Sequence, residues 1–164
     1  MRLAVGQATH PMLEFRPCPV DEEPAAALVQ GMRDEMAALY DGLDLDGPDM
    51  PKAGPGELGP PGGTFVVGFE DDVPVCCGGV KRLPDGACEV KKMFVVAAAR
   101  GRGVARALLV ELERRARDLG YAVARLDTGP RQTRARRMYE RADYIPIDNF
   151  NANPVASFFG EKRL

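Results

Sequence analysis

Two glycines and three arginines crowd the segment 100–106, which reads Arg-Gly-Arg-Gly-Val-Ala-Arg. The glycines allow a tight backbone turn that leaves amide groups exposed, and a strongly amphipathic segment follows directly. The first N–H groups of a helix have no partner within the helix, and they carry the positive end of its dipole. A loop of this kind binds phosphate, and Arg100, Arg102 and Arg106 would add positive charge. The loop alone is equally compatible with a plain strand-to-helix turn whose arginines are solvated.

Two common nucleotide-binding motifs do not fit this segment. A dinucleotide fingerprint needs a third glycine where Arg106 stands, and an acidic residue at the end of a strand about 20 residues later. Tyr121 only opens the next predicted strand. A P-loop needs Gly-Lys-Ser/Thr, which is absent. The phosphate site is therefore of another type.

The hydrophobic pattern places this loop between a strand and a helix of a mixed fold. We predict strands at 12–16, 64–69, 73–80, 88–96, 121–126, 144–147 and 156–164, and helices at about 24–40, 104–119 and 132–141. Asp21 is the expected N-cap of the first helix, and Gly120 ends the second. Short turns between neighbouring strands favour antiparallel pairing. The fold class is α/β (α+β), with a mixed, mostly antiparallel central sheet of six to seven strands flanked by helices on both faces.

The segment 41–63 is predicted to be a long loop, because 12 of its 23 residues are glycine or proline. Loops of this length inside a compact domain are usually functional or disordered. It carries one basic residue, Lys52, against five acidic residues: Asp41, Asp44, Asp46, Asp49 and Glu57. If the loop borders a substrate site, its charge would favour a cationic amine. The alternative is a solvated loop whose charge does not matter.

Composition excludes several classes of protein. A net charge of −2 argues against nucleic-acid binding, and no apolar run approaches the roughly 20 residues of a membrane span. Residues 1–10 lack the apolar core of a signal peptide, so we expect a cytoplasmic protein. We expect no metal site, because the spacing of the cysteines suits none and the only histidine is His10. We predict reduced, packed thiols at Cys18, Cys76, Cys77 and Cys88.

Two segments together resemble the GCN5-related N-acetyltransferase (GNAT) family. The first runs from the strand Glu89-Val90-Lys91-Lys92-Met93-Phe94-Val95 to Arg100-Gly101-Arg102-Gly103-Val104-Ala105-Arg106-Ala107-Leu108-Leu109, and is similar to the family's Arg/Gln-x-x-Gly-x-Gly/Ala signature. The second, Ala135-Arg136-Arg137-Met138-Tyr139-Glu140-Arg141-Ala142-Asp143-Tyr144, resembles its Ala-x-x-x-Tyr-x-x-x-Gly-Phe/Tyr segment. The specific similarity covers residues 87–147. We expect a mobile leader at 1–10, and the resemblance implies a single N-acetyltransferase domain at 11–164.

The resemblance implies acetyl-CoA (coenzyme A) as the cofactor. Backbone groups of Met93, Phe94 and Val95 would pair with pantetheine, and amides of Arg100, Gly101, Arg102, Gly103, Val104, Ala105 and Arg106 would hold the pyrophosphate. Tyr139 would protonate the leaving thiolate. Gln132 stands where a cofactor-contacting asparagine is common, Ala97 where a proline is common, and Asp143 where glycine is usual. Asp143 therefore suggests a changed turn.

Acetyl transfer to an amine needs a base for the amine, a donor for the oxyanion and an acid for the thiolate. Glu89, on the strand expected to line the acetyl group, is the candidate base, directly or through water. Its alternative role is a solvent-facing glutamate or an ion pair with Lys91. The Val95 amide is the candidate oxyanion donor, and Tyr139 the candidate acid. An aromatic packed in the core is the alternative for Tyr139.

Three functions remain open from the sequence. The first is an enzyme that acetylates a primary amine of a small molecule by direct transfer in a ternary complex. The second is a protein or peptide N-acetyltransferase, and the third is a non-catalytic acyl-CoA-binding regulatory module. Asp127 and the turn Asp148-Asn149 are possible acceptor contacts. The apolar strand containing Phe158 and Phe159 could form a homodimer interface.

Overall fold

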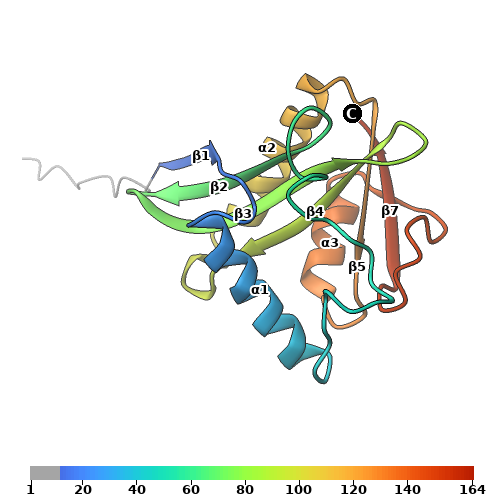
Figure 1. Cartoon of the computed structure of the whole chain (residues 1–164), viewed down its shortest axis with the longest axis horizontal. Helices are drawn as coiled ribbons and strands as arrows, with labels where there is room; N and C mark the ends of the chain where they lie inside the picture. The colour runs from blue at the N-terminus through green and yellow to red at the C-terminus, as the bar shows by residue number, and fades with distance from the viewer. Residues whose placement is uncertain (1–11) are drawn as a thin grey trace, which may run out of the picture.

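The computed structural model describes residues 12–164, so the predicted leader and His10 lie outside the described residues. Strands and helices are interspersed along the chain (Figure 1). In order they are β1 (Leu13–Pro17), α1 (Ala25–Leu39), β2 (Thr64–Glu70), β3 (Val73–Arg82), β4 (Cys88–Val95), a 3-10 turn (Ala97–Ala99), α2 (Val104–Asp118), β5 (Val123–Thr128), α3 (Thr133–Arg141), β6 (Ile145–Pro146) and β7 (Phe158–Arg163).

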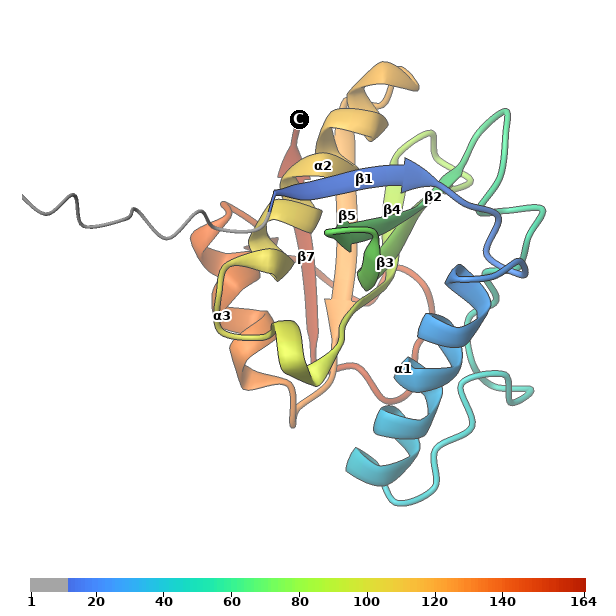
Figure 2. The same cartoon turned by 90° about the vertical axis from the view of Figure 1, so that its left-hand side faces the viewer.

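One seven-stranded sheet has the order β1-β2-β3-β4-β5-β7-β6. Only the β4–β5 pair is parallel, and the other pairs are antiparallel. Helix α1 covers one face of the sheet, and α2 and α3 cover the other (Figure 2). The predicted fold class is confirmed. Within residues 12–164, no helix is long and apolar enough to cross a membrane.

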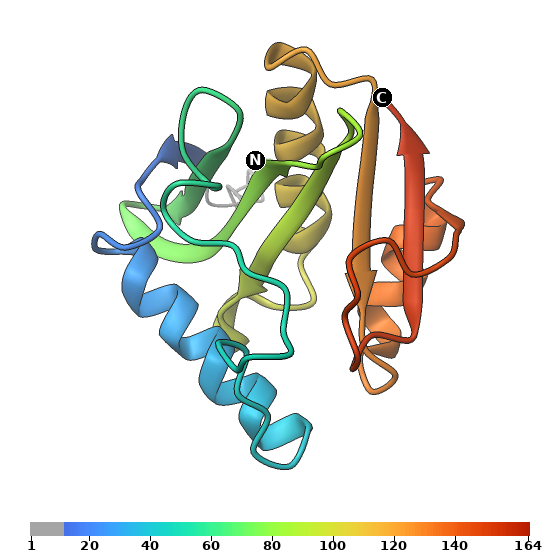
Figure 3. The ribbon, with the colours of Figure 1, turned by 45° about the vertical axis from the view of Figure 1, so that its right-hand side comes forward.

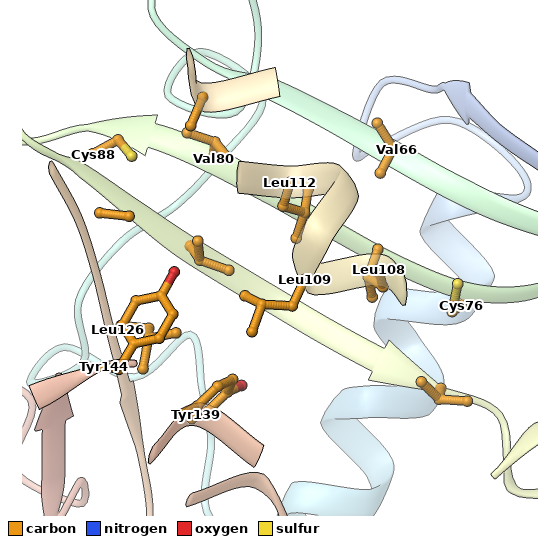
Figure 4. Close-up of a cluster of buried hydrophobic side chains, with 14 of the residues drawn as sticks. Val66, Cys76, Val80, Cys88, Leu108, Leu109, Leu112, Leu126, Tyr139 and Tyr144 are labelled. Atoms are coloured by element: carbon orange, nitrogen blue, oxygen red, sulfur yellow. The ribbon is translucent and has the colours of Figure 1, made fainter. Parts of the chain in front are cut away.

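Each face of the sheet has its own hydrophobic core because strand side chains alternate between faces. On β2, Val66 packs in the cluster under α2, whereas Phe65 and Val67 pack in the cluster under α1. The first cluster includes fully buried leucines from α2, namely Leu108, Leu109 and Leu112 (Figure 4). Burying each such side chain stabilises the fold by about 1.5–3 kcal/mol.

A β-bulge in β4 separates this strand from β5. Lys92, with φ 56°, and Met93 both stand opposite Gly78 of β3. The bulge bends β4, and β4 pairs with β5 only at Cys88↔Ala124 and Glu89↔Arg125. From Val90 onward the two strands diverge (Figure 3). β5 instead pairs along its length with β7, so a wedge-shaped gap opens inside the sheet.

Several local predictions need correction. Pro24, not Asp21, is the N-cap of α1, and it makes no side-chain capping bond. The carboxylate of Glu23 instead accepts a hydrogen bond from the N–H of Ala27 at 3.2 Å. Asp143 has φ 73°, the left-handed conformation that glycine favours, so the turn is retained despite the substitution.

The C-terminal aromatic pair does not form an exposed surface. Phe158 is 3% and Phe159 is 9% exposed, because β7 lies between β5 and β6 in the sheet. These two side chains pack within the chain and offer no exposed apolar surface, so a homodimer interface stays a prediction that they do not support.

The cysteine prediction is confirmed. All four cysteines are free, and burial raises the pKa of the Cys76, Cys77 and Cys88 thiols to about 12. These thiols stay protonated at neutral pH and are poor nucleophiles.

Candidate active site

A cavity of about 730 Å³ occupies the gap between β4 and β5 and extends onto both faces of the sheet. On one face it is lined by the first turn of α2 and by α3; on the other it is lined by α1 and the 41–63 loop. The sequence-predicted site residues that line it are Met93, Phe94, Val95, Arg100, Gly101, Gly103, Val104, Ala105, Arg106, Gln132 and Tyr139. Arg102 and Glu89 do not line it.

The loop 100–106, which is predicted to bind phosphate, has the backbone that the glycines predicted. Gly101 has φ 78° and Gly103 has φ 82°, and a Cβ at either position would meet nothing within 4 Å. Gly103 is the N-cap of α2, and no side chain caps the helix. The N–H groups of the first turn are therefore free to bind an anion in the cavity.

Two of the three arginines in the loop, Arg100 and Arg102, form ion pairs with other parts of the chain. Arg100 donates to the carbonyl of Val95 at 2.9 Å and to the carboxylate of Glu35 at 2.5 Å, which braces the loop against β4 and α1. Arg102 pairs with Glu70 at 3.0 Å, away from the cavity. Arg106, Arg131 and Arg134 line the cavity and supply its positive charge.

The edge of β4 that faces the gap is open to a ligand. The N–H of Val96 donates to Val75 on the β3 side at 2.9 Å. Because successive N–H groups of a strand point to opposite edges, the N–H of Val95 faces the gap. Across the gap, the hydroxyl of Thr128 is buried without a hydrogen-bond partner in the described chain, and Thr128 lines the cavity. Both groups fit a polar ligand lying between the strands.

Tyr139 is a buried phenol at the cavity wall on the α2–α3 face (Figure 4). Its hydroxyl donates to the sulfur of Met93 at 3.8 Å, and its ring packs edge-on against Tyr144. Burial raises the pKa of the Tyr139 phenol, and the nearby Asp127 raises it further. Tyr139 therefore holds its proton across the physiological pH range.

Glu89 is fully buried on the opposite face, behind the cavity. One carboxylate oxygen accepts a hydrogen bond from Asn151 at 2.7 Å and lies 3.5 Å from the ammonium of Lys91. The other oxygen has no partner in the described residues. Burial raises the pKa of Glu89, Lys91 lowers it and Asp127 raises it. The ion pair with Lys91 exists, but the alternative of a solvent-facing glutamate is wrong.

Asp127 lines the cavity on this face with its carboxylate. It accepts hydrogen bonds from Asn151 at 2.7 Å and from Asn153 at 3.0 Å. The amide of Asn151 therefore bridges Glu89 and Asp127. Sequence reasoning missed these asparagines, although Asn149-Phe150-Asn151-Ala152-Asn153 is a conspicuously polar run between two predicted strands. Asp148 and Asn149 do not line the cavity.

The end of α1 is tied to the β5–α3 connection beside the cavity. The side-chain oxygen of Gln132 accepts hydrogen bonds from the N–H of Gly129 at 3.0 Å and from the hydroxyl of Tyr40 at 3.3 Å. Arg131 donates to the carbonyl of Leu39 at 2.6 Å. Gln132 thus fixes the loop that precedes α3 while also lining the cavity.

The 41–63 loop borders the cavity, but it does so without its acidic residues. None of the five acidic residues of the 41–63 loop lines the cavity, and all five are exposed. Asp46 pairs with Arg33 at 2.9 Å, and Asp41 lies 3.7 Å from Arg131. The loop turns its apolar residues inward, namely Leu43, Leu45, Met50, Pro51 and Ala53. Alternation within Leu43-Asp44-Leu45-Asp46 explains why the acids point to solvent.

Comparisons with known proteins agree with this architecture. Residues 29–144 match the model of the Acetyltransferase (GNAT) family. A protein of Azospirillum brasilense named IAA acetyltransferase is 34% identical over 111 residues, which cover 65% of this chain and 72% of that protein.

Solved structures of low sequence identity share the fold. A GNAT-family acetyltransferase from Staphylococcus aureus has a TM-score of 0.74 at 16% identity, covering 93% of this chain and 99% of that chain. The PaiA N-acetyltransferase from Thermoplasma acidophilum, in complex with coenzyme A, has a TM-score of 0.66 at 14% identity, with coverage of 93% and 99%. The fold is that of the acetyltransferases. The family match spans most of the chain, so this protein belongs to the GNAT acetyltransferase family.

Proposed function

We propose that the protein is an acetyl-CoA-dependent N-acetyltransferase that acts on a primary amine of a small molecule. The observation that carries the proposal is the cavity between β4 and β5, with an uncapped helix N-terminus on one face and mainly apolar residues of α1 and the 41–63 loop on the other. Two substrates can meet in the gap, which suits direct transfer in a ternary complex. The names of the Azospirillum relative and of the coenzyme A complex support this proposal.

The α2–α3 face fits the nucleotide-bearing substrate. The uncapped amides of Val104, Ala105 and Arg106 would hold a pyrophosphate, with Arg106 and Arg134 beside it. The unpaired edge of β4 at Met93–Val95 would pair with the pantetheine arm, and the Thr128 hydroxyl offers a further polar contact. Acetyl-CoA bound there supplies a thioester-linked acetyl group and leaves as the free thiol.

The chain provides groups for both proton movements. The amine nitrogen must lose a proton, and the Asp127 carboxylate lines the acceptor face. The amide of Asn151 donates to both this carboxylate and that of Glu89 and holds them in place. We propose that the proton passes to Asp127, or to Glu89 through a water molecule. The Tyr139 phenol, on the other face, gives its proton to the departing sulfur. The Val95 N–H faces the gap and would stabilise the oxyanion.

A thiol-release assay tests the proposal. The protein is supplied with acetyl-CoA and a panel of small primary amines, basic peptides and no amine. We expect release that depends on a small amine, with one acetylated amine formed per thiol. Release that requires a peptide would assign protein acetylation, and tight acetyl-CoA binding without amine-dependent release would assign a regulatory module.

A further inference from the structure

The acceptor half of the cavity carries an unexpected cationic side chain. On the α1 face, β4 contributes Lys91 and Lys92 to the lining. Lys91 is neutralised by Glu89, 3.5 Å away. Lys92 forms no ion pair and no side-chain hydrogen bond with any residue of 12–164.

Lys92 occupies its position because of the β-bulge. It is the bulged residue, with φ 56°, and its neighbours Arg33 and Asp46 lie on the α1 side of the sheet. Burial lowers the pKa of the Lys92 ammonium and Arg33 lowers it further, while Asp46 raises it. Asp46 is already paired with Arg33 at 2.9 Å. The charge of Lys92 therefore lacks a counter-ion of its own.

A second cavity meets the first at this lysine. It has a volume of about 490 Å³ and lies between α1 and the 41–63 loop. The two cavities share Lys92 and three apolar loop residues, Leu45, Pro51 and Ala53. An acceptor that enters the first cavity can thus reach Lys92, which lines both cavities.

The space between Lys92 and the gap is apolar. Helix α1 lines it with Met32, Met36 and Leu39, and Phe94 of β4 lines it from the sheet. Gly31 lets α1 approach Phe94, since a Cβ there would stand 3.3 Å from the ring. Thioether and aromatic side chains suit a hydrophobic or aromatic substrate body.

We propose that the acceptor is an amine with an apolar body and a carboxylate, and that Lys92 is the residue that binds the carboxylate. This inference rests on the proposed N-acetyltransferase function and names its substrate class. The amine lies at the gap beside Asp127, the apolar body lies on α1 and Phe94, and the carboxylate pairs with Lys92. Among the described residues that line the first cavity, Asp127 and Glu35 carry the carboxylates, and Glu35 is already paired with Arg100. Asp21, Asp46 and Glu57 line the second cavity, where Asp46 is paired with Arg33 and all three residues are exposed to solvent. A second cationic group placed at Lys92 would be repelled by its ammonium, whereas a carboxylate there would pair with it.

Matched ligands that differ only in one group test the proposal. One set is 4-(aminomethyl)benzoate, 4-methylbenzylamine, which lacks the carboxylate, and 4-methylbenzoate, which lacks the amine. The second set is phenylalanine, phenethylamine and 3-phenylpropionate. Thiol release gives kcat/KM for the amines, and calorimetry with coenzyme A present gives the affinity of the two amine-free acids.

In at least one set, we expect the amine that carries a carboxylate to have a higher kcat/KM than the amine that lacks it. A charge-assisted hydrogen bond supports a preference of about 10- to 100-fold in kcat/KM. Lys92→Met should lower kcat/KM for the carboxylate-bearing amines, mainly through KM, and by much more than it changes kcat/KM for the carboxylate-free amines, so that the preference disappears. Lys92→Arg should retain most of it. Arg117→Met removes a cation from the exposed end of α2 and serves as the matched control.

The outcomes separate the two proposals. If no amine is acetylated but an amine-free acid binds wild-type protein and not Lys92→Met, the carboxylate site stands and the N-acetyltransferase proposal fails. If amines are acetylated without preference for a carboxylate in either set, the enzyme proposal stands and the carboxylate site is overturned. Equal preference in wild-type protein and Lys92→Met also overturns the assignment to Lys92.

Discussion

Tyr139 and Glu89 are both buried acids, but they relate differently to the cavity. Tyr139 lines it from the α3 side, and within residues 12–164 its hydroxyl has only the Met93 sulfur as a hydrogen-bond partner. Glu89 lies behind it, held by Asn151 and Lys91. The first can touch a reacting atom, whereas the second could take part in the reaction only through water. Substitutions at these two residues should therefore change different observables.

Replacing Tyr139 by phenylalanine should lower kcat by about 100-fold, a typical contribution of a general acid. The ring keeps its packing, so coenzyme A affinity should change much less. Tyr144→Phe is the matched control, because Tyr144 is similarly buried and in contact with Tyr139 but does not line the cavity. Steady-state kinetics and calorimetry measure both quantities. Equal kcat in the two variants would assign Tyr139 to the core alone.

Glu89 should also make stability depend on pH. Burial raises its folded-state pKa above the ordinary 4.5, so the folded protein binds more protons than the unfolded chain between these pKa values. The stability linked to Glu89 is full below pH 4.5 and is lost as pH rises through the folded-state pKa. Wild-type protein should therefore lose stability relative to Glu89→Gln over this range. Thermal unfolding at a series of pH values checks this, and a constant difference would contradict it.

At the scale of elements, the sequence was sufficient where local pattern determines structure. The turn at Asp71 and Asp72, the amphipathic α2 and the glycine loop before it all follow from short-range rules. The bulge at Lys92 does not, because it depends on how β4 meets Gly78 of β3. Because the sequence does not predict the bulge, it also does not predict the gap between β4 and β5 or the position of Lys92 beside two cavities.

The sequence predicted the backbone conformation of the candidate site, but it did not predict the partners of its charged residues. Gly101 and Gly103 have the expected left-handed conformations. The partners of Arg102 and Glu89, which are Glu70 and Asn151, lie 32 and 62 residues away in sequence. The ion-pair partner of a charged residue depends on the tertiary structure. The local sequence pattern therefore could not show that Arg102 pairs with Glu70 instead of lining the cavity.

The proposed role of the first turn of α2 in binding phosphate can be tested with the glycines that flank this helix, Gly103 and Gly120. Gly103 precedes it with φ 82°, and Gly120 follows it with φ 91°; a Cβ at either position would meet nothing within 4 Å. Valine should strain the backbone at both positions. Only Gly103→Val should weaken coenzyme A binding, by at least about 10-fold. Calorimetry on the folded variants measures this, and similar affinities would remove the phosphate role of the loop.

At the scale of the whole molecule, the sheet consists of two parts joined by a short seam. Strands β1 to β4 form one part, and β5, β7 and β6 form the other. Backbone pairing between them is limited to Cys88↔Ala124 and Glu89↔Arg125. Side chains of α2 and α3, among them Leu108 and Tyr139, complete the connection in one core. A ligand in the gap would therefore contact both parts.

Coenzyme A should consequently stabilise the entire chain. A ligand that binds only the folded state, at 100 times its dissociation constant, adds about 2.7 kcal/mol to the free energy of unfolding. For a chain of this size this corresponds to a rise in Tm of about 5–10 °C. The rise should shrink at high salt, because Arg106 and Arg134 attract the phosphates through a screened interaction. Hydrogen exchange should slow in both β4 and β5, since the ligand would link the two parts of the sheet where they are unpaired. Thermal unfolding and hydrogen exchange with and without coenzyme A measure these effects, with Gly103→Val as the variant that should lose both. Protection confined to α2 would show that the ligand binds the helix end without entering the gap.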